Sequence, residues 1–96
     1  MTVAAQDKIY IINTIKKYFP SAKIMAFGSR IRSDHKKFSD LDLCLNDSIP
    51  LPLAKWCKLE EEFSNSNLLY KVDLCDWHRI SKDFQQIIAQ TCETWQ

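Results

Sequence analysis

The sequence predicts an α+β fold, an α/β sandwich in which a small mixed β-sheet is covered by helices on one face. Three short apolar runs of strand-like composition alternate with segments whose apolar residues recur every three or four positions. The resulting order is helix, strand, short helix, strand, helix, strand, helix. We expect a single domain spanning residues 1–96, because the chain shows no repeat, low-complexity stretch or linker.

Three segments have the apolar spacing of amphipathic helices. The first covers residues 5–19 and is stopped by Pro20. The second covers residues 53–63, and the third follows Ser81, a favourable N-cap residue. Their apolar stripes are Ile9, Ile12, Ile15 and Phe19 in the first; Trp56, Leu59 and Phe63 in the second; and Phe84, Ile87, Ile88, Thr91 and Trp95 in the third.

The predicted strands cover residues 23–27, 40–45 and 69–76. The first is a continuous apolar run, and the second alternates strictly between acidic or small residues and leucine. A short helix is expected directly after Gly28 and Ser29, followed by a polar and basic loop over residues 33–39. The sheet therefore contains at least these three strands.

Charge and composition exclude several classes of protein. With 13 Lys and Arg against 12 Asp and Glu, the net charge is +1, and we expect no direct nucleic-acid binding through bulk charge. The chain has no apolar run of transmembrane length and no secretory signal near Met1, so a cytoplasmic location is expected. Its 4 cysteines form no C-x-x-C pair, which disfavours a zinc site, and Cys44 and Cys75 are expected to be buried as small apolar residues.

Two aspartates stand out in the second strand. Asp40 and Asp42 are two positions apart, so both carboxylates lie on the same face of the strand while the leucines occupy the other. Solvent-facing acids on an edge strand would be the simpler interpretation, but Asp is depleted in strands and neighbouring carboxylates repel. We expect the pair to bind a divalent metal, because Mg²⁺ prefers oxygen ligands.

Asp73 is the third candidate acid. Its neighbours Val72 and Leu74 are predicted to face the core, so Asp73 points the opposite way and joins Asp40 and Asp42 if the two strands are adjacent. Three such carboxylates can hold two Mg²⁺ ions for phosphoryl chemistry, with Asp73 acting as metal ligand or base. Asp76 has the opposite parity and is expected to cap the end of the strand.

The only glycine of the chain, Gly28, precedes Ser29 at a strand end. A turn of this kind allows backbone N–H groups to approach a phosphate, although an ordinary tight turn would need the same residues. Arg30 and Arg32 are candidates for neutralising a triphosphate, or are common surface arginines. The combination with two aspartates some ten residues later predicts a site for a nucleoside triphosphate.

Three motifs together, Gly28-Ser29-x-x-Arg32, Ser39-Asp40-Leu41-Asp42-Leu43 and Val72-Asp73-Leu74, resemble the minimal nucleotidyltransferase (MNT) family of the DNA polymerase β superfamily. The resemblance implies a nucleotidyltransferase catalytic lobe. It also implies that Asp40, Asp42 and Asp73 are catalytic and hold two Mg²⁺ ions, and that ATP is the substrate. The nucleotide-binding residues would be Gly28, Ser29, Arg30, Arg32 and Ser39. Ile31 and Ser33 replace a small residue and a glycine that are frequent in the family, so a stiffer or differently shaped basic loop is expected.

A lone lobe of this kind is expected to need a partner, because nothing further along the chain would hold an acceptor. The resemblance implies a helical HEPN protein, the toxin of a type VII toxin–antitoxin pair, to whose tyrosine the MNT antitoxin transfers AMP. A homodimer is also compatible with so small a chain. Two other functions stay open: a non-catalytic module that neutralises its partner by complex formation, and, less favoured, a transferase for small molecules such as aminoglycosides.

Overall fold

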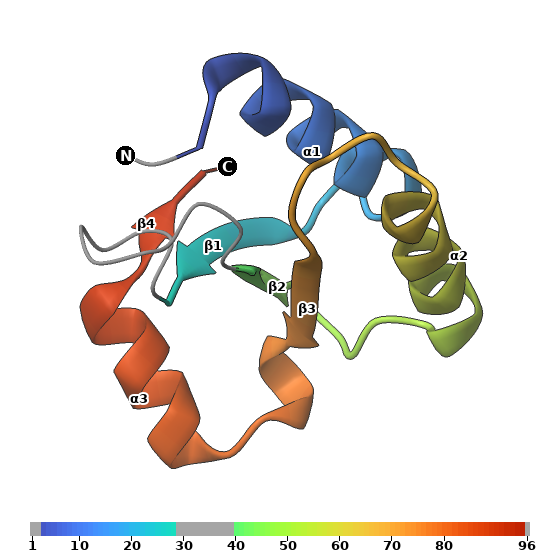
Figure 1. Ribbon diagram of the computed structural model, residues 1–96. Coiled ribbons are helices and arrows are strands. Elements are labelled where there is room, and N and C mark those ends of the chain that lie inside the picture. The colour runs from blue at the N-terminus through green and yellow to red at the C-terminus, as the bar shows by residue number, and fades with distance from the viewer. Residues whose placement is uncertain (1–2, 29–39, 96) are drawn as a thin grey trace.

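The computed structural model describes residues 3–28 and 40–95 and contains a mixed four-stranded sheet flanked by helices (Figure 1). The strand order is β3-β2-β1-β4, with β1 antiparallel to both of its neighbours and β2 parallel to β3. The α+β class is therefore confirmed. The elements are α1 (Ala5–Tyr18), β1 (Lys23–Phe27), β2 (Leu41–Asn46), α2 (Leu53–Ser64), β3 (Val72–Asp76), the 3₁₀ helix η1 (Trp77–Arg79), α3 (Lys82–Thr91) and β4 (Glu93–Thr94).

Most of the core lies between one face of the sheet and the helices α1 and α2. Because side chains alternate along β2, Leu41, Leu43 and Leu45 all point into this core, where they are fully buried. Helix α2 connects the parallel strands β2 and β3, as such a crossover requires. Within residues 3–28 and 40–95, no helix has both the length and the apolar character needed to cross a bilayer.

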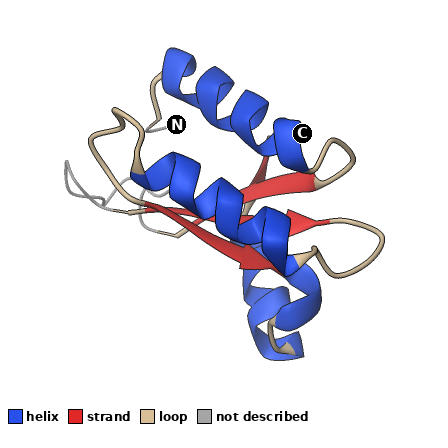
Figure 2. Ribbon diagram, turned by 90° about the vertical axis from the view of Figure 1, so that its right-hand side faces the viewer, coloured by secondary structure: helices blue, strands red, loops and turns tan. Residues whose placement is uncertain are grey.

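The prediction that all helices cover one face is wrong for α3. Ile88 of α3 is buried against Met25 and Cys44, which point away from the main core. Figures 1 and 2 show α3 on the other side of the sheet from α1 and α2. The apolar residues on this second face form a small cluster, and that cluster needs its own helix to cover it.

The stripe predicted for α1 is also corrected. Ile9 is 61% exposed, whereas Ile11 and Ile15, four positions apart, are fully buried. Two positions on a helix are separated by about 200° around its axis, so Ile9 must face outward when Ile11 faces inward. Phe19, directly after the helix, is buried as expected.

The last helix is shorter than its apolar spacing predicts. It begins at the expected N-cap, where the Ser81 hydroxyl accepts from the backbone N–H of Phe84. It ends at Thr91, and the chain then forms β4 alongside β1 instead of continuing helically to Trp95. The Trp95 backbone N–H donates to the Ile24 carbonyl at 2.8 Å, and its indole is buried in the main core.

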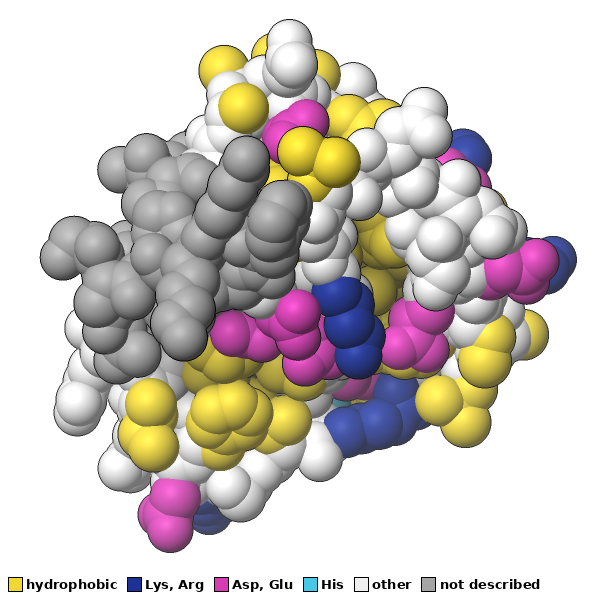
Figure 3. All heavy atoms as spheres, viewed as in Figure 1, with side chains coloured by type: hydrophobic (Ala, Val, Ile, Leu, Met, Phe, Trp, Pro, Cys, Tyr) yellow, Lys and Arg dark blue, Asp and Glu magenta, His cyan; other side chains and the backbone are white. Residues whose placement is uncertain are grey.

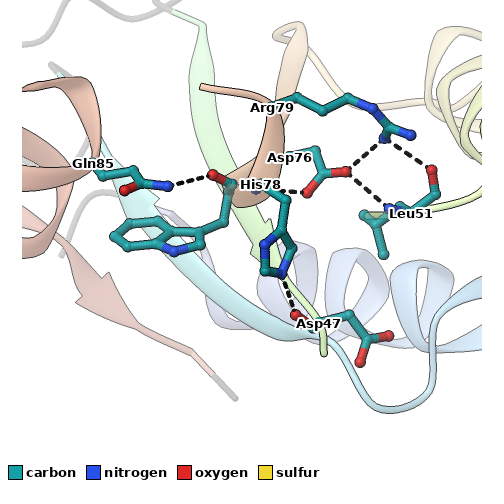
Figure 4. Close-up of polar contacts among 7 residues, drawn as sticks. Asp47, Leu51, Asp76, His78, Arg79 and Gln85 are labelled. Atoms are coloured by element: carbon teal, nitrogen blue, oxygen red, sulfur yellow. Dashed lines mark hydrogen bonds and ion pairs between the residues drawn. The ribbon is translucent and has the colours of Figure 1, made fainter. Parts of the chain in front are cut away.

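A buried carboxylate holds the far end of the sheet together (Figure 4). The Asp76 side chain, only 3% exposed, accepts from the backbone N–H groups of Leu51 and His78 and from the Arg79 guanidinium. Arg79 also donates to the Leu51 carbonyl at 2.8 Å. Asp76 thus caps η1, as expected of a strand-end residue, and ties the β2–α2 connection to the end of β3.

We predict that Asp76→Ala destabilises the protein by about 2–4 kcal/mol, because it leaves the Leu51 N–H and the Arg79 charge without their buried partner. Urea denaturation followed by circular dichroism measures this loss. The exposed Glu60→Ala provides the control for losing one acidic side chain. A loss equal to that of the control would show that the Asp76 contacts add no net stability.

Candidate active site

Two of the predicted acids lie directly side by side on the sheet. Asp42 of β2 is in register with Asp73 of β3, and Phe27 of β1 is in register with Asp42 on its other side. All three side chains share the face that α3 partly covers, because their neighbours along each strand fill the main core. The expected meeting of Asp42 and Asp73 is therefore seen in the structure.

Asp40 lies one residue before β2 and is exposed. The next residue, Leu41, donates its backbone N–H to the Lys71 carbonyl at 2.9 Å, which keeps the starts of β2 and β3 level. Acidic side chains gather in the middle of the face seen in Figure 3. The backbone thus brings three predicted acids to one end of the parallel strand pair.

The electrostatics of this cluster are unfavourable for ionised carboxylates. Partial burial raises the pKa of Asp42 above its usual range, and the neighbouring carboxylates of Asp73 and Asp40 raise this pKa further. In the described part of the chain, no ion pair involves any of the three acids. A divalent cation or a cationic side chain would relieve the repulsion between them.

Carboxylate oxygens are the donor type that Mg²⁺ prefers, so the chemistry of this cluster fits such an ion. Residues 3–28 and 40–95 contain no ready-made group of three or more His, Cys, Asp or Glu side chains around a common metal position. Asp42 and Asp73 fit as a pair of ligands, and Asp40 is near enough to contribute to the raised pKa of Asp42.

Gly28 follows β1 and lies against the acids. Its φ of +84° is in the left-handed region that favours glycine. A Cβ at this position would overlap the Asp42 carboxylate, being 3.1 Å even from its Cγ. The left-handed φ and the crowded Cβ position explain why the only glycine of the chain lies here. Ser29, Arg30, Arg32 and Ser39, and the family departures Ile31 and Ser33, lie outside the described residues.

Beneath the row of Phe27, Asp42 and Asp73 lies a row of apolar residues. Met25, Cys44 and Cys75 are in register on the same face, and Ile88 of α3 packs on them. The Cys44 thiol is fully buried, and its hydrogen bond with Cys75 and its burial raise its pKa. Cys44 is therefore a packed thiol, as predicted, while Cys75 is only partly buried.

One feature of the site was missed from the sequence. The Phe27 ring meets the Phe84 ring of α3 edge to face, with 5.6 Å between centroids. Phe27 was assigned only to an apolar strand and Phe84 only to a helix stripe. The signal was the position of Phe27, directly before Gly28 of the motif that is predicted to bind phosphate. A hollow away from these residues is lined by Phe63, Ser66 and Tyr70.

The chain is similar to known proteins over most of its length. The family model described as "Polymerase beta, Nucleotidyltransferase" matches residues 10–93. The chain is 41% identical over 85 residues to a probable protein adenylyltransferase, MntA, of Haemophilus influenzae, and the alignment covers 88% of this chain and 75% of that protein. Residues 10–93 include β1, β2 and β3, all of α2 and α3, and most of α1.

Solved structures share the fold. A toxin–antitoxin crystal structure with AMP-PNP has a TM-score of 0.77 at 23% identity and covers 96% of this chain and 73% of its own. A complex of a tri-AMPylated HEPN toxin with its MNT antitoxin, from Shewanella oneidensis, has a TM-score of 0.72 at 22% identity, covering 94% and 70%. With its family model matched over residues 10–93, the chain belongs to the polymerase β nucleotidyltransferase family.

Proposed function

We propose that this protein is a single-domain, Mg²⁺-dependent nucleotidyltransferase that transfers AMP from ATP to a tyrosine hydroxyl of a helical, HEPN-type partner. In this role it is the antitoxin of a type VII pair and acts in the cytoplasm. The observation that carries the proposal is the alignment of Asp42 and Asp73 on adjacent strands, with Gly28 against the Asp42 carboxylate. The MntA relative's name and the AMPylated toxin in the similar complex support the choice of nucleotide and acceptor.

Each residue has a chemical role in this proposal. Asp40, Asp42 and Asp73 hold two Mg²⁺ ions, which when bound neutralise charge that develops on the phosphates. Gly28 leaves room for the triphosphate to approach the backbone, and the remaining nucleotide-binding residues are Ser29, Arg30, Arg32 and Ser39.

The acceptor oxygen forms a new bond to the α-phosphorus while the bond from that phosphorus to the bridging oxygen breaks. Pyrophosphate leaves, and the hydroxyl proton passes to the Asp73 carboxylate. Asp73 suits this role because it is exposed on β3, a strand at the edge of the sheet that an acceptor protein can reach. Binding and alignment of the two substrates supply much of the remaining rate enhancement.

Intact-mass spectrometry of the helical partner tests the proposal. After incubation with this protein, Mg²⁺ and ATP, we expect the partner to gain one or more AMP units. The double variant Asp40→Asn/Asp42→Asn is the control and should give no gain. A stable complex without any gain, with each of the four nucleotides, would replace the proposal by the non-catalytic binding module.

A further inference from the structure

A partly exposed aromatic surface borders the acidic row. Phe84 is 36% exposed and Ile87, on the next turn of α3, is 56% exposed. Ile88, four positions after Phe84 and on the same side of α3, is fully buried against the sheet, so Phe84 lies at the edge of the packed side and stays partly open to solvent. In Figure 3, hydrophobic side chains gather immediately below the acidic ones on the same face of the molecule.

The contacts place this surface within one nucleotide's length of the acids. Phe27 is the register partner of Asp42, and neighbouring strands are about 4.8 Å apart. The Phe84 ring contacts the Phe27 ring, and the centroids of the two rings are 5.6 Å apart. A nucleotide whose phosphates lie at Gly28 and the acids can therefore reach Phe84 with its base.

We propose that Phe84 is the residue on which the nucleobase of ATP stacks, with Ile87 beside it. This inference rests on the proposed function and adds the part of the site that binds the base. The edge-to-face contact with Phe27 already orients the Phe84 ring, so little conformational freedom is lost when a base packs on it. The surface offered by two side chains suits a planar ring and is far smaller than the roughly 800 Å² per partner of a stable protein interface.

Stacking on an aromatic ring tolerates every base, because each base has a π-face. Phe84 therefore contributes affinity for a nucleotide over a bare triphosphate, and does not by itself select adenine. This distinction makes the inference testable separately from the chemistry at the acids.

Isothermal titration calorimetry with two Mg²⁺-loaded probes tests it. One probe is α,β-methylene ATP, which has a base and a bond that is not cleaved, and the other is tripolyphosphate, which has no base. We expect Phe84→Leu, which keeps most of the apolar volume, to weaken the affinity for the nucleotide about tenfold. Affinity for tripolyphosphate should not change, and Phe84→Tyr should retain nucleotide affinity.

Tyr10→Leu is the matched control, because Tyr10 is 39% exposed and also makes an edge-to-face contact, with Phe63, but on α1. Unchanged nucleotide affinity in Phe84→Leu, with Asp42-dependent binding of both probes intact, would overturn this inference and leave the proposed function standing. If Phe84→Leu weakened binding of the partner protein but not of the nucleotide, the surface around Phe84 would be a partner-binding surface. That result would also overturn this inference. If the wild-type protein bound neither probe, both proposals would fall.

Discussion

Asp42→Asn is expected to reduce AMP transfer by on the order of a thousandfold or more. The substitution keeps the shape of the side chain but removes the charge that lies between Asp73 and Gly28. Metal ions contribute several kcal/mol to such reactions, and about 1.4 kcal/mol corresponds to a factor of ten in rate. Timed mass spectrometry of the partner at saturating Mg²⁺ and ATP measures the effect.

The same substitution is expected to raise the melting temperature at neutral pH, measured in EDTA, by a few degrees. The pKa of Asp42 is raised in the folded protein by burial and by Asp73 and Asp40, so the folded state holds its proton more tightly than the unfolded state. Stability is therefore lost as pH rises from the usual carboxyl range through the raised pKa. Asn at this position avoids that loss, and its advantage should disappear below about pH 4.

Two results would contradict this account of Asp42. Transfer at the wild-type rate would show that the residue is not a metal ligand. If Asp42→Asn lost activity as expected but was less stable than the wild type at neutral pH, the Asp42 carboxylate would make net favourable contacts in the folded protein. The neighbouring acids would then not destabilise it. Glu60→Gln, on an exposed position of α2, controls for the loss of one negative charge.

Gly28→Ala is expected to destabilise the fold by roughly 2–5 kcal/mol and to abolish transfer. The left-handed backbone costs a residue with a Cβ about 1–2 kcal/mol, and crowding in a packed site adds about 1–3 kcal/mol. The added methyl group meets the Asp42 carboxylate, so it displaces the side chain that we propose to be catalytic as well as the backbone. Urea denaturation and the mass-spectrometric transfer assay measure the two effects.

Ala26→Gly serves as the comparison, since it exchanges the same two residue types in the opposite direction two residues earlier, within β1, where Ala26 is fully buried. Ala26→Gly should lower the free energy of unfolding, while the molecules that remain folded should transfer AMP at the normal rate. Normal transfer by Gly28→Ala would show that Asp42 can move away without loss of function, and that the contact between these two residues is not needed.

Local patterns predicted the site better than the packing around it. Strict alternation in β2 was enough to place Asp42 opposite the leucines, and the same parity in β3 placed Asp73 on the same face if the two strands were adjacent, as they are. Strand β1 was predicted to the residue because a short apolar run beside a turn is a strong signal. These features depend only on the period of two along a strand.

The errors arose where the answer depends on what an element packs against. The same helical spacing in α1 allowed Ile9 or Ile11 to face inward, and only the position of the sheet decides between them. A strand of two residues such as β4 has no period to detect, so Trp95 was assigned to the helix. The face that α3 covers, and with it the contact between Phe27 and Phe84, is a tertiary property.

The parallel pairing of β2 with β3 also determines when activity can arise during folding. Asp42 and Asp73 meet only after the chain between them has formed α2 and returned to the sheet. Contacts so distant in sequence are closed late, because loop entropy must first be overcome. Partly folded chains therefore lack the paired acids, and the proposed transfer requires the strands β2 and β3 to be paired.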